Sequence, residues 1–251
     1  MSELKLVSPL LDQMSVEEEI AGHNGCTCYA LRHVQSGERF VVKRISVPAS
    51  DLQVRALILS GAYPDDAAVH AYYGSVAEDI KNELDTGMRL AENGYFAGAS
   101  SYQIEPKESG IGYDVYILYP RMVSLRALTG LRAVNLGIDL CDALTACRDA
   151  GYLFENLKPE NVFLTQSGRF LLGDLGLAPL EDLQYASVPE NYLGPYSAPE
   201  LSAITASPNP TIDLYAVGML LYRIYNGNHG PFEDEATGEA MADKLRLTGK
   251  A

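Results

Sequence analysis

The chain has 251 residues, 47% of them hydrophobic, and its 33 acidic and 19 basic side chains give a formal net charge of −14. This length is enough for one large domain or for two lobes that each have a hydrophobic core. A surface this acidic repels phosphate backbones and anionic lipid headgroups, so nucleic acids and membrane surfaces are poor partners, although acidity also simply keeps proteins soluble.

The pattern of cysteines and apolar residues bears on location. The four cysteines include no C-x-x-C pair, and the four histidines are too scattered for a zinc site. The sequence does not start with a basic region followed by an apolar stretch, and its longest apolar stretch, 215–225, contains Arg223 and is too short to cross a bilayer. We therefore expect a cytoplasmic protein with reduced thiols and no membrane insertion.

The first predicted elements are strands. Alternating residues over 26–45 predict two antiparallel strands with a turn at Gln35–Glu38, and Pro48 ends the second strand. Ser50 and the residues after it predict a short helix that reaches about Ser60.

The next predicted helix, about 66–92, has one inward-facing stripe. Its members recur every three or four residues, at Val69, Tyr73, Val76, Ile80, Glu83, Gly87 and Leu90. Glu83 stands on this stripe among apolar neighbours, and a buried carboxylate is costly unless a cation pairs with it. Lys43, at the end of an apolar strand, is the expected partner; a Glu83 side chain that reaches solvent at the edge of the stripe is the alternative.

The later part of the chain is mainly helical. The predicted elements are a strand at 113–119, helices at 124–129 and 133–150, short strands over 152–174 and a buried helix at 211–226. Strands with one long helix, followed by helices, indicate an α+β protein with two lobes joined near 119–122.

Five motifs occur along the chain in a characteristic order. They are Phe40-Val-Val-Lys43, Leu157-Lys-Pro-Glu-Asn161, Gly173-Asp-Leu-Gly176, Ala198-Pro-Glu200 and Asp213 at the head of the buried helix. Together they resemble the signature set of eukaryotic-type serine/threonine protein kinases, and the resemblance runs from about Ile20 to about Phe232. It implies a bilobal protein-kinase-like fold, with a β-rich N-lobe at 1–119, an extra helical insert at about 49–64, and a mainly helical C-lobe at 120–251 that is incomplete at its C-terminus.

The resemblance also implies ATP and Mg²⁺ as cofactors. Lys43 would hold the α and β phosphates, Glu83 would orient Lys43, and Lys158 would neutralise the γ phosphate. Asn161 and Asp174 would supply oxygen ligands to the magnesium ion. A structural ion-pair network without any ligand is the alternative.

The adenine slot departs from the family pattern. Val41 stands above the adenine where the family usually has Ala, and Phe163 stands below it where Leu is usual. Both changes narrow the slot, at a cost of ~1–3 kcal/mol if nothing relaxes. Cys28 in place of a Val returns a little space, and the resemblance also places Leu118 among the nucleotide-binding residues.

The phosphate lid is altered as well. Gly22 and Gly25 are out of phase with the three glycines of the family's hairpin. Such a shifted loop could still approach the phosphates through these glycines. An ordinary Gly/Asn turn explains them equally well.

The strongest departure lies in the catalytic loop. Phe154-Glu155-Asn156 stands where the family has His-Arg-Asp, so a neutral amide replaces the proton acceptor, a loss that typically costs ~10²–10⁴-fold in rate. Glu155 removes the cation that pairs with a phosphorylated activation loop, and Leu193 replaces a bridging Thr. These changes favour a pseudokinase that regulates or scaffolds an unidentified protein partner. A weakly active serine/threonine kinase with a protein substrate is the alternative.

Overall fold

The computed structural model divides into two compact units, and each is described by itself. Unit 1 holds residues 1–88 and 98–121, and unit 2 holds residues 89–97 and 122–251. The structure describes residues 4–23, 25–108, 110–125, 132–155, 157–165, 167–173, 178–179, 194–202, 209–234 and 236–248.

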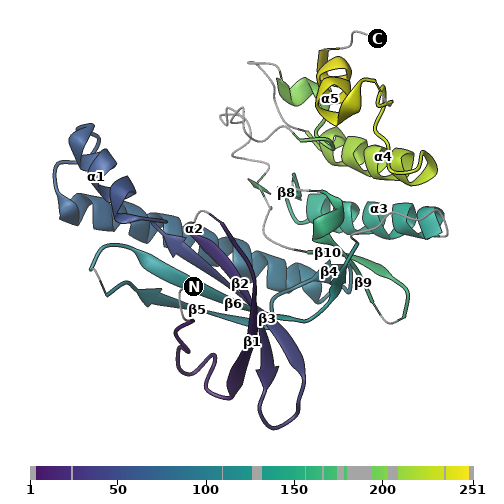
Figure 1. Ribbon diagram of the computed structural model, residues 1–251. Coiled ribbons are helices and arrows are strands. Elements are labelled where there is room, and N and C mark those ends of the chain that lie inside the picture. Colours follow the sequence, from purple (N-terminus) through teal and green to yellow (C-terminus); the bar gives the residue numbers. More distant parts are fainter. Residues whose placement is uncertain are drawn as a thin grey trace. The chain divides into compact units, whose positions relative to one another are not determined.

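Unit 1 is built on a five-stranded antiparallel sheet with the order β1-β2-β3-β6-β5 (Figure 1). The strands are β1 (Met14–His23), β2 (Cys26–His33), β3 (Arg39–Val47), β5 (Ser101–Pro106) and β6 (Tyr113–Pro120). The predicted turn joins β2 to β3, where Gly37 has a φ of +74° and donates its N–H to the carbonyl of His33 at 2.9 Å. A β-carbon is strained at this backbone angle, which explains the glycine.

One face of this sheet is covered by the N-terminal segment of the chain. Leu4, Val7 and Leu11 pack on the sheet in one buried cluster. The strand members of that cluster alternate along β2, β3 and β6, and they are Tyr29, Leu31, Val42, Tyr116 and Leu118. Period-2 alternation puts these side chains on a single face.

The opposite face of the sheet packs against α2 (Asp66–Ala91) and α1 (Asp51–Leu59). Figure 1 shows α2 running along the sheet. Val47 of β3, Val54 of α1, and Val69 and Tyr73 of α2 form the buried centre of this contact. The extra helix therefore packs within unit 1 through its Val54 side, whereas Leu52 on the same helix is exposed.

Unit 2 is mainly helical and has a small sheet. Its helices are α3 (Ala133–Asp149), α4 (Thr211–Tyr225) and α5 (Gly238–Thr248), with short 3₁₀ turns at Pro159–Asn161 and Pro199–Ser202. Its four-stranded sheet has the order β4-β10-β9-β7, formed by β4 (Phe96–Ala97), β7 (Val123–Ser124), β9 (Val162–Leu164) and β10 (Phe170–Gly173). A two-stranded sheet pairs β8 (Tyr152–Leu153) with β11 (Ala178–Pro179).

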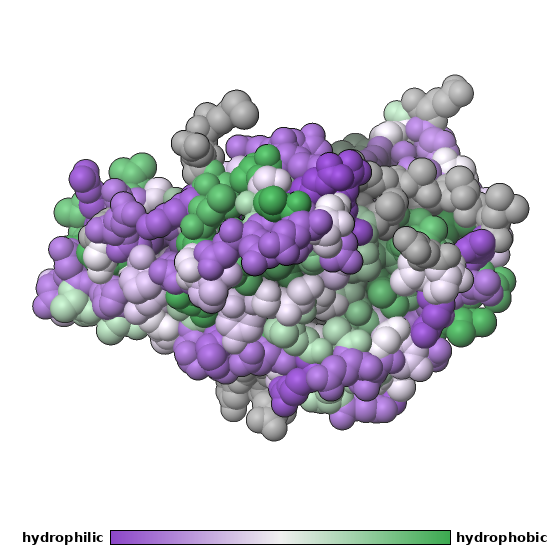
Figure 2. Space-filling model, turned by 90° about the horizontal axis from the view of Figure 1, so that it is seen from below, coloured by the Kyte–Doolittle hydropathy of each residue, from purple (hydrophilic) through white to green (hydrophobic). Residues whose placement is uncertain are grey.

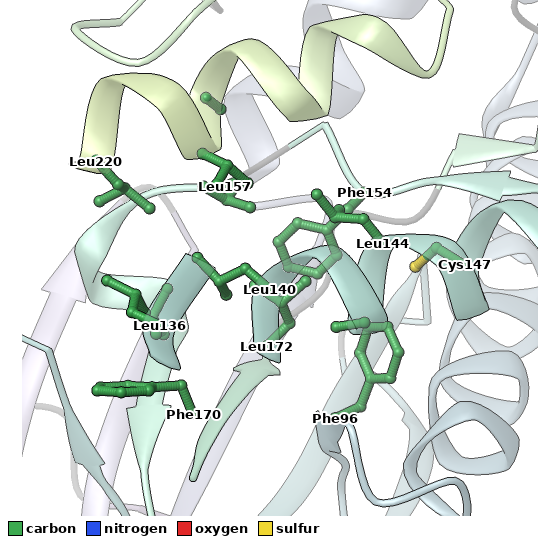
Figure 3. Close-up of a cluster of buried hydrophobic side chains, with 14 of the residues drawn as sticks. Phe96, Leu136, Leu140, Leu144, Cys147, Phe154, Leu157, Phe170, Leu172 and Leu220 are labelled. Carbon is green, nitrogen blue, oxygen red and sulfur yellow. The ribbon is translucent and has the colours of Figure 1, made fainter. Parts of the chain in front are cut away.

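The core of unit 2 lies around α3, as Figure 3 shows. Leu136, Leu140, Leu144 and Cys147 recur at helical spacing on one side of α3 and are all buried. They pack with Leu172 of β10 and with residues of α4. This burial raises the pKa of the Cys147 thiol to about 12, so the thiol stays neutral.

The predicted α+β class with two lobes is confirmed, and the local predictions are mostly correct. The helix expected at 66–92 is α2, that at 133–150 is α3, and that at 211–226 is α4. The helix expected at 124–129 is wrong at its start, because Val123–Ser124 pair with β9 as strand β7. Residues 126–129 of that prediction lie outside the described residues.

The exterior is mixed. The face in Figure 2 is largely hydrophilic, with hydrophobic residues in separate groups. Across the described part of the chain, no helix combines the length and the apolar composition needed to span a bilayer.

Candidate functional site

Asp213 of α4 fixes the loop that follows β8. Its two carboxylate oxygens accept hydrogen bonds from the backbone N–H groups of Phe154 and Glu155, at 2.9 and 3.0 Å. The residue is only 4% exposed, and this burial raises the pKa of Asp213 while the two hydrogen bonds partly offset the rise. The helix predicted to be buried is buried on one side only, since Leu214 and Tyr225 are exposed, and Asp213 lies on the side that packs in the core.

Phe154 anchors the same loop from the other side. Its ring is 1% exposed and packs in the core of unit 2, where it lies 6.4 Å from the ring of Phe96 (Figure 3). An aromatic ring buried in this way contributes packing energy rather than chemistry. The change to Phe at this position is therefore structurally quiet, as the sequence suggests.

Glu155 has an unusual backbone. Its φ of +52° lies in the left-handed region, which non-glycine residues seldom adopt. The side chain is half-buried, and burial, together with the charge of Asp213, raises the pKa of the Glu155 carboxyl. Strain of this kind is kept where the surroundings determine the backbone, and here the N–H bond to Asp213 does so.

The next residues form a short 3₁₀ turn that places two predicted site residues. Lys158 precedes the turn, and its carbonyl accepts the N–H of Asn161 at 3.0 Å. Asn161 is 3% exposed and directly precedes β9, whereas Lys158 is half-buried. The antiparallel pair Val162–Leu172 brings Asn161 and Gly173 to the same end of the hairpin. Asp174, the next residue in the sequence, lies outside the described residues.

Phe163 accounts for the glycine before Asp174. A β-carbon at Gly173 would lie 2.6 Å from the Phe163 ring and 2.9 Å from the β-carbon of Ala97. No side chain fits at that distance, so the large Phe163 requires a glycine here. The large Phe163 side chain on β9 is thus matched by the absence of a side chain at Gly173 on β10.

Unit 1 brings several other predicted residues onto one face of its sheet. Lys43 on β3 stands opposite Cys28 on β2 and Ile117 on β6, and Val41 lies on the same face two residues earlier. This is the face that α2 covers, because Ile45 and Val47 follow at the same period and pack against the helix.

Glu83 lies on the side of α2 that meets this face. Ile80, one turn before Glu83, packs in the same cluster as Ile45, which lies two residues after Lys43. Helical and strand periods therefore direct Glu83 and Lys43 toward the same region. Both residues take part in interactions within the structure.

Leu118 is placed differently from the expectation. It pairs with Val42, and both belong to the buried cluster beneath the N-terminal segment, on the face opposite Lys43. The structure therefore does not bring the Leu118 side chain together with Lys43, Cys28 and Val41. A shift of one residue along a strand reverses its face, which sequence similarity alone does not resolve.

The two glycines of the expected lid have different surroundings. Gly22 lies within β1 opposite Thr27, and a β-carbon there would meet only side-chain atoms, the nearest at 3.3 Å. Gly25 has a φ of +78°, its carbonyl accepts the N–H of Ser46 at 2.7 Å, and a β-carbon there would lie 2.5 Å from that of Ala49. A structural need therefore explains Gly25, and its approach to phosphates stays a prediction.

A cavity of about 180 Å³ lies within unit 2 beside the loop after β8. The segment Gly194–Ala198 forms one wall, and a turn closes it, since Ser197 donates its N–H to the carbonyl of Gly194 at 3.0 Å. The other lining residues are Glu155, Leu157, Lys158, Leu201, Ile212, Asp213 and Ala216.

Comparison with known proteins decides the family. The model of the protein kinase domain matches residues 123–249. The chain belongs to the protein kinase family. It is similar to the probable serine/threonine-protein kinase PknB of Corynebacterium glutamicum, with 31% identity over 168 residues, which are 63% of this chain and 26% of that protein.

Two further relatives are similar over shorter stretches. The serine/threonine-protein kinase Pkn1 of Myxococcus xanthus is 34% identical over 45% of this chain and 17% of its own length. The serine/threonine-protein kinase PkaA of Streptomyces coelicolor is 35% identical over 47% of this chain and 22% of its own length. The chain thus matches about a quarter or less of these curated relatives.

Three positions that matter for kinase chemistry, Asn156, Asp174 and Leu193, lie outside the described residues. Within the described part of the kinase domain, no group of three or more His, Cys, Asp or Glu side chains could hold a metal ion. The oxygen ligands proposed for Mg²⁺ are the carboxylate of Asp174 and the amide of Asn161. This hard, oxygen-rich set suits Mg²⁺ rather than a thiophilic metal.

Two arginines of the kinase domain were not expected to be part of the site. Arg246 of α5 donates to the carbonyls of Gly194 and Ser197, at 3.0 and 2.5 Å, with a side chain that is only 3% exposed. Arg223 of α4 stacks over Tyr196, with its guanidinium carbon 5.4 Å from the ring centroid. A charge in the apolar run at 215–225 is a sequence signal for Arg223, whereas nothing in the sequence singles out Arg246.

Proposed function

We propose that this chain is a pseudokinase, a kinase-shaped regulatory or scaffolding module that acts on a protein partner and still binds ATP with Mg²⁺. One observation supports this above all: the catalytic-loop frame is intact, with Asp213 holding the Phe154 and Glu155 amides, yet the next residue is Asn156. An amide side chain does not accept a proton near pH 7. The frame for catalysis is kept while its general base is replaced.

Neighbouring substitutions support the same proposal. In the family resemblance, Glu155 stands in place of an arginine and Leu193 in place of a threonine. The first replaces a cation that would bind a phosphorylated activation loop, and the second removes a hydroxyl that would bridge the catalytic residues. Loss of the base together with these groups is expected when phosphoryl transfer is not the task.

Nucleotide binding rests on a set of side chains with the right charges. Lys43 would bind the α and β phosphates, oriented by Glu83, and Lys158 would neutralise the γ phosphate. Asn161 and Asp174 would bind Mg²⁺, which neutralises and orients phosphate oxygens when it is bound. Cys28 and Val41, on the Lys43 face of the sheet, would contact the adenine together with Phe163.

A weakly active serine/threonine protein kinase is the second candidate. It is supported by the relatives, which are named serine/threonine-protein kinases, and by the retained lysines and metal ligands. In that case positioning and charge neutralisation would supply the rate without the general base. A cytoplasmic location, predicted from the sequence, is part of both candidates.

Thermal shift tests nucleotide binding. Addition of ATP with Mg²⁺ should raise the melting temperature, since a ligand at a hundred times its Kd stabilises by about 2.7 kcal/mol. Lys43→Met should lose most of this shift. Lys81→Met is the matched control, because Lys81 on α2 forms ion pairs with its helix neighbours Glu78 and Asp85 and is not among the residues proposed to bind ATP. No shift at millimolar nucleotide in the native chain would refute nucleotide binding.

Radiolabel transfer from ATP tests the loss of the base. The native chain should label itself and a generic peptide only at trace level, whereas Asn156→Asp should raise labelling by an order of magnitude or more, about the range lost with a general base. If the native chain labels well and Asn156→Asp labels no better, it is an active kinase and the pseudokinase proposal is wrong.

A further inference from the structure

The cavity beside Glu155 combines apolar walls with carboxylates. Its walls come from Leu157, Pro195, Leu201, Ile212 and Ala216, among others. The charged groups that line it are Glu155, Asp213 and Lys158, two negative charges and one positive. The cavity is built entirely within unit 2, so its geometry depends on one rigid core.

The two carboxylates that line this cavity differ in their partners. Asp213 directs both of its oxygens to backbone N–H groups, whereas Glu155 forms no ion pair with any lysine or arginine among the described residues. It is half-buried beside a second carboxylate. A carboxylate in that setting is stabilised by an opposite charge, and its strained backbone holds it there.

Two arginines near the cavity bind other groups, and Lys158, which lines it, forms no ion pair with Glu155 among the described residues. Arg246 binds the Gly194 and Ser197 carbonyls and Asp243, and Arg223 binds Glu239 at 2.8 Å. The stretch 174–193, which leads into the cavity wall, contains four acidic residues and no lysine or arginine in the sequence. An intramolecular cation from that stretch is therefore excluded by composition.

We propose that this cavity binds the side chain of an arginine or lysine from the protein partner. The apolar walls accommodate the methylene stem, and Glu155 meets the cationic head. The inference rests on the proposed function to the extent that both assign a protein partner to this module. It adds that the partner presents a basic residue. Glu155 stands where the family resemblance would put an arginine, so the positive charge at this place would come from the partner.

Nuclear magnetic resonance titration tests the site without knowledge of the partner. The probes are the N-acetyl, N-methylamide derivatives of arginine, norleucine and glutamate, added to ¹⁵N-labelled protein. Arginine should shift the amide signals of Glu155 and of the Gly194–Ala198 segment. It should bind roughly tenfold more tightly than norleucine, as a hydrogen bond between charged groups implies, and glutamate should not bind.

Substitutions test whether the Glu155 carboxylate causes the preference for arginine. Glu155→Gln keeps the size and the backbone bond to Asp213 and should abolish the preference for arginine over norleucine. Glu160→Gln, on the exposed side of the adjacent 3₁₀ turn, is the matched control and should bind arginine as the native chain does. The dispersion of the amide spectrum verifies that each variant is folded.

Equal binding of arginine and norleucine, or an undiminished arginine preference in Glu155→Gln, would overturn the inference. Signal changes confined to other surfaces would do the same. Its failure is separable from failure of the proposed function, because Glu155, the residue changed in the test, is not among the residues proposed to bind ATP or Mg²⁺. Loss of arginine binding with a normal ATP shift refutes only the basic-residue site.

Discussion

Replacement of Arg246 by Met should lower the stability of unit 2, including the segment Gly194–Ala198 that forms one wall of the cavity beside Glu155. The guanidinium of Arg246 donates to the carbonyls of Gly194 and Ser197, to the hydroxyl of Tyr215 at 3.2 Å and to Asp243 at 3.2 Å. Methionine preserves most of the apolar stem but none of these donors. The variant therefore separates the loss of hydrogen bonds from the loss of packing.

The expected cost follows from the groups left behind. Two partly buried carbonyls lose their donor, at about 1–3 kcal/mol each, and the hydroxyl and carboxylate add less because water can reach Asp243. We therefore expect Arg246→Met to lower the free energy of unfolding by roughly 3 kcal/mol, or about 6–12 °C in melting temperature for a chain of this size. Arg246→Lys should recover only part of the lost unfolding free energy, since the single ammonium of lysine cannot reproduce the planar guanidinium that donates to both carbonyls.

Urea unfolding followed by circular dichroism measures this cost. Arg148→Met is the control, because Arg148 is half-exposed at the end of α3 and pairs with its neighbour Asp149, so its change should stay within about 0.5 kcal/mol. A loss below about 1 kcal/mol for Arg246→Met, or equal losses for the two variants, would show that the carbonyl bonds are not stabilising and would refute the reasoning.

Three further outcomes are expected. Gly112→Ala should be far more destabilising than Gly61→Ala, although both glycines have a positive φ. A β-carbon at Gly112 would lie 2.1 Å from the carbonyl oxygen of Val47, whereas a β-carbon at Gly61 would have no other atom within 4 Å. Equal losses of unfolding free energy in urea would contradict this expectation. Leu140→Ala should cost about 2–5 kcal/mol in the same assay, since Leu140 is fully buried in the core of unit 2. Glu155→Gln should raise the melting temperature relative to the native chain at pH 7 but not at pH 4. Because the pKa of Glu155 is raised in the folded state, protonated Glu155 stabilises the fold relative to the carboxylate, and this stability is lost as the pH rises through the pKa of the folded state. A difference in melting temperature between Glu155→Gln and the native chain that does not change with pH would contradict the raised pKa of Glu155.

The sequence predicts much of this structure where the periodicity is strong. The stripe of α2 is visible because seven residues repeat at helical spacing, and Val69 and Leu90 on it are buried. The place of Lys43 follows from strand alternation in β3. The loop after β8 follows from the motif at 157–161, whose spacing is fixed by a short 3₁₀ turn and a hairpin.

Other features could not be predicted because they depend on long-range contacts. Strand β1 contains three consecutive glutamates and shows no alternation, and its pairing with β2 at the edge of the sheet stabilises it instead. The N-terminal segment packs on the sheet through Leu4, Val7 and Leu11, whose partners are distant in sequence. The face of Leu118 depends on that packing, which is why its predicted nucleotide contact differs from its place in the structure.

The loop after β8 is held by Asp213 and by Phe154. Asp213 holds the loop through backbone N–H groups, which every residue but proline supplies. Phe154 holds it through burial of a ring, which does not require the imidazole of the family pattern. Neither anchor depends on the residue at position 156, so an exchange of Asp for Asn there leaves both in place. A chain can therefore keep the kinase frame under selection for folding and binding while the proton acceptor is lost, and a partner-binding role at Glu155 would preserve the loop for a purpose other than phosphoryl transfer.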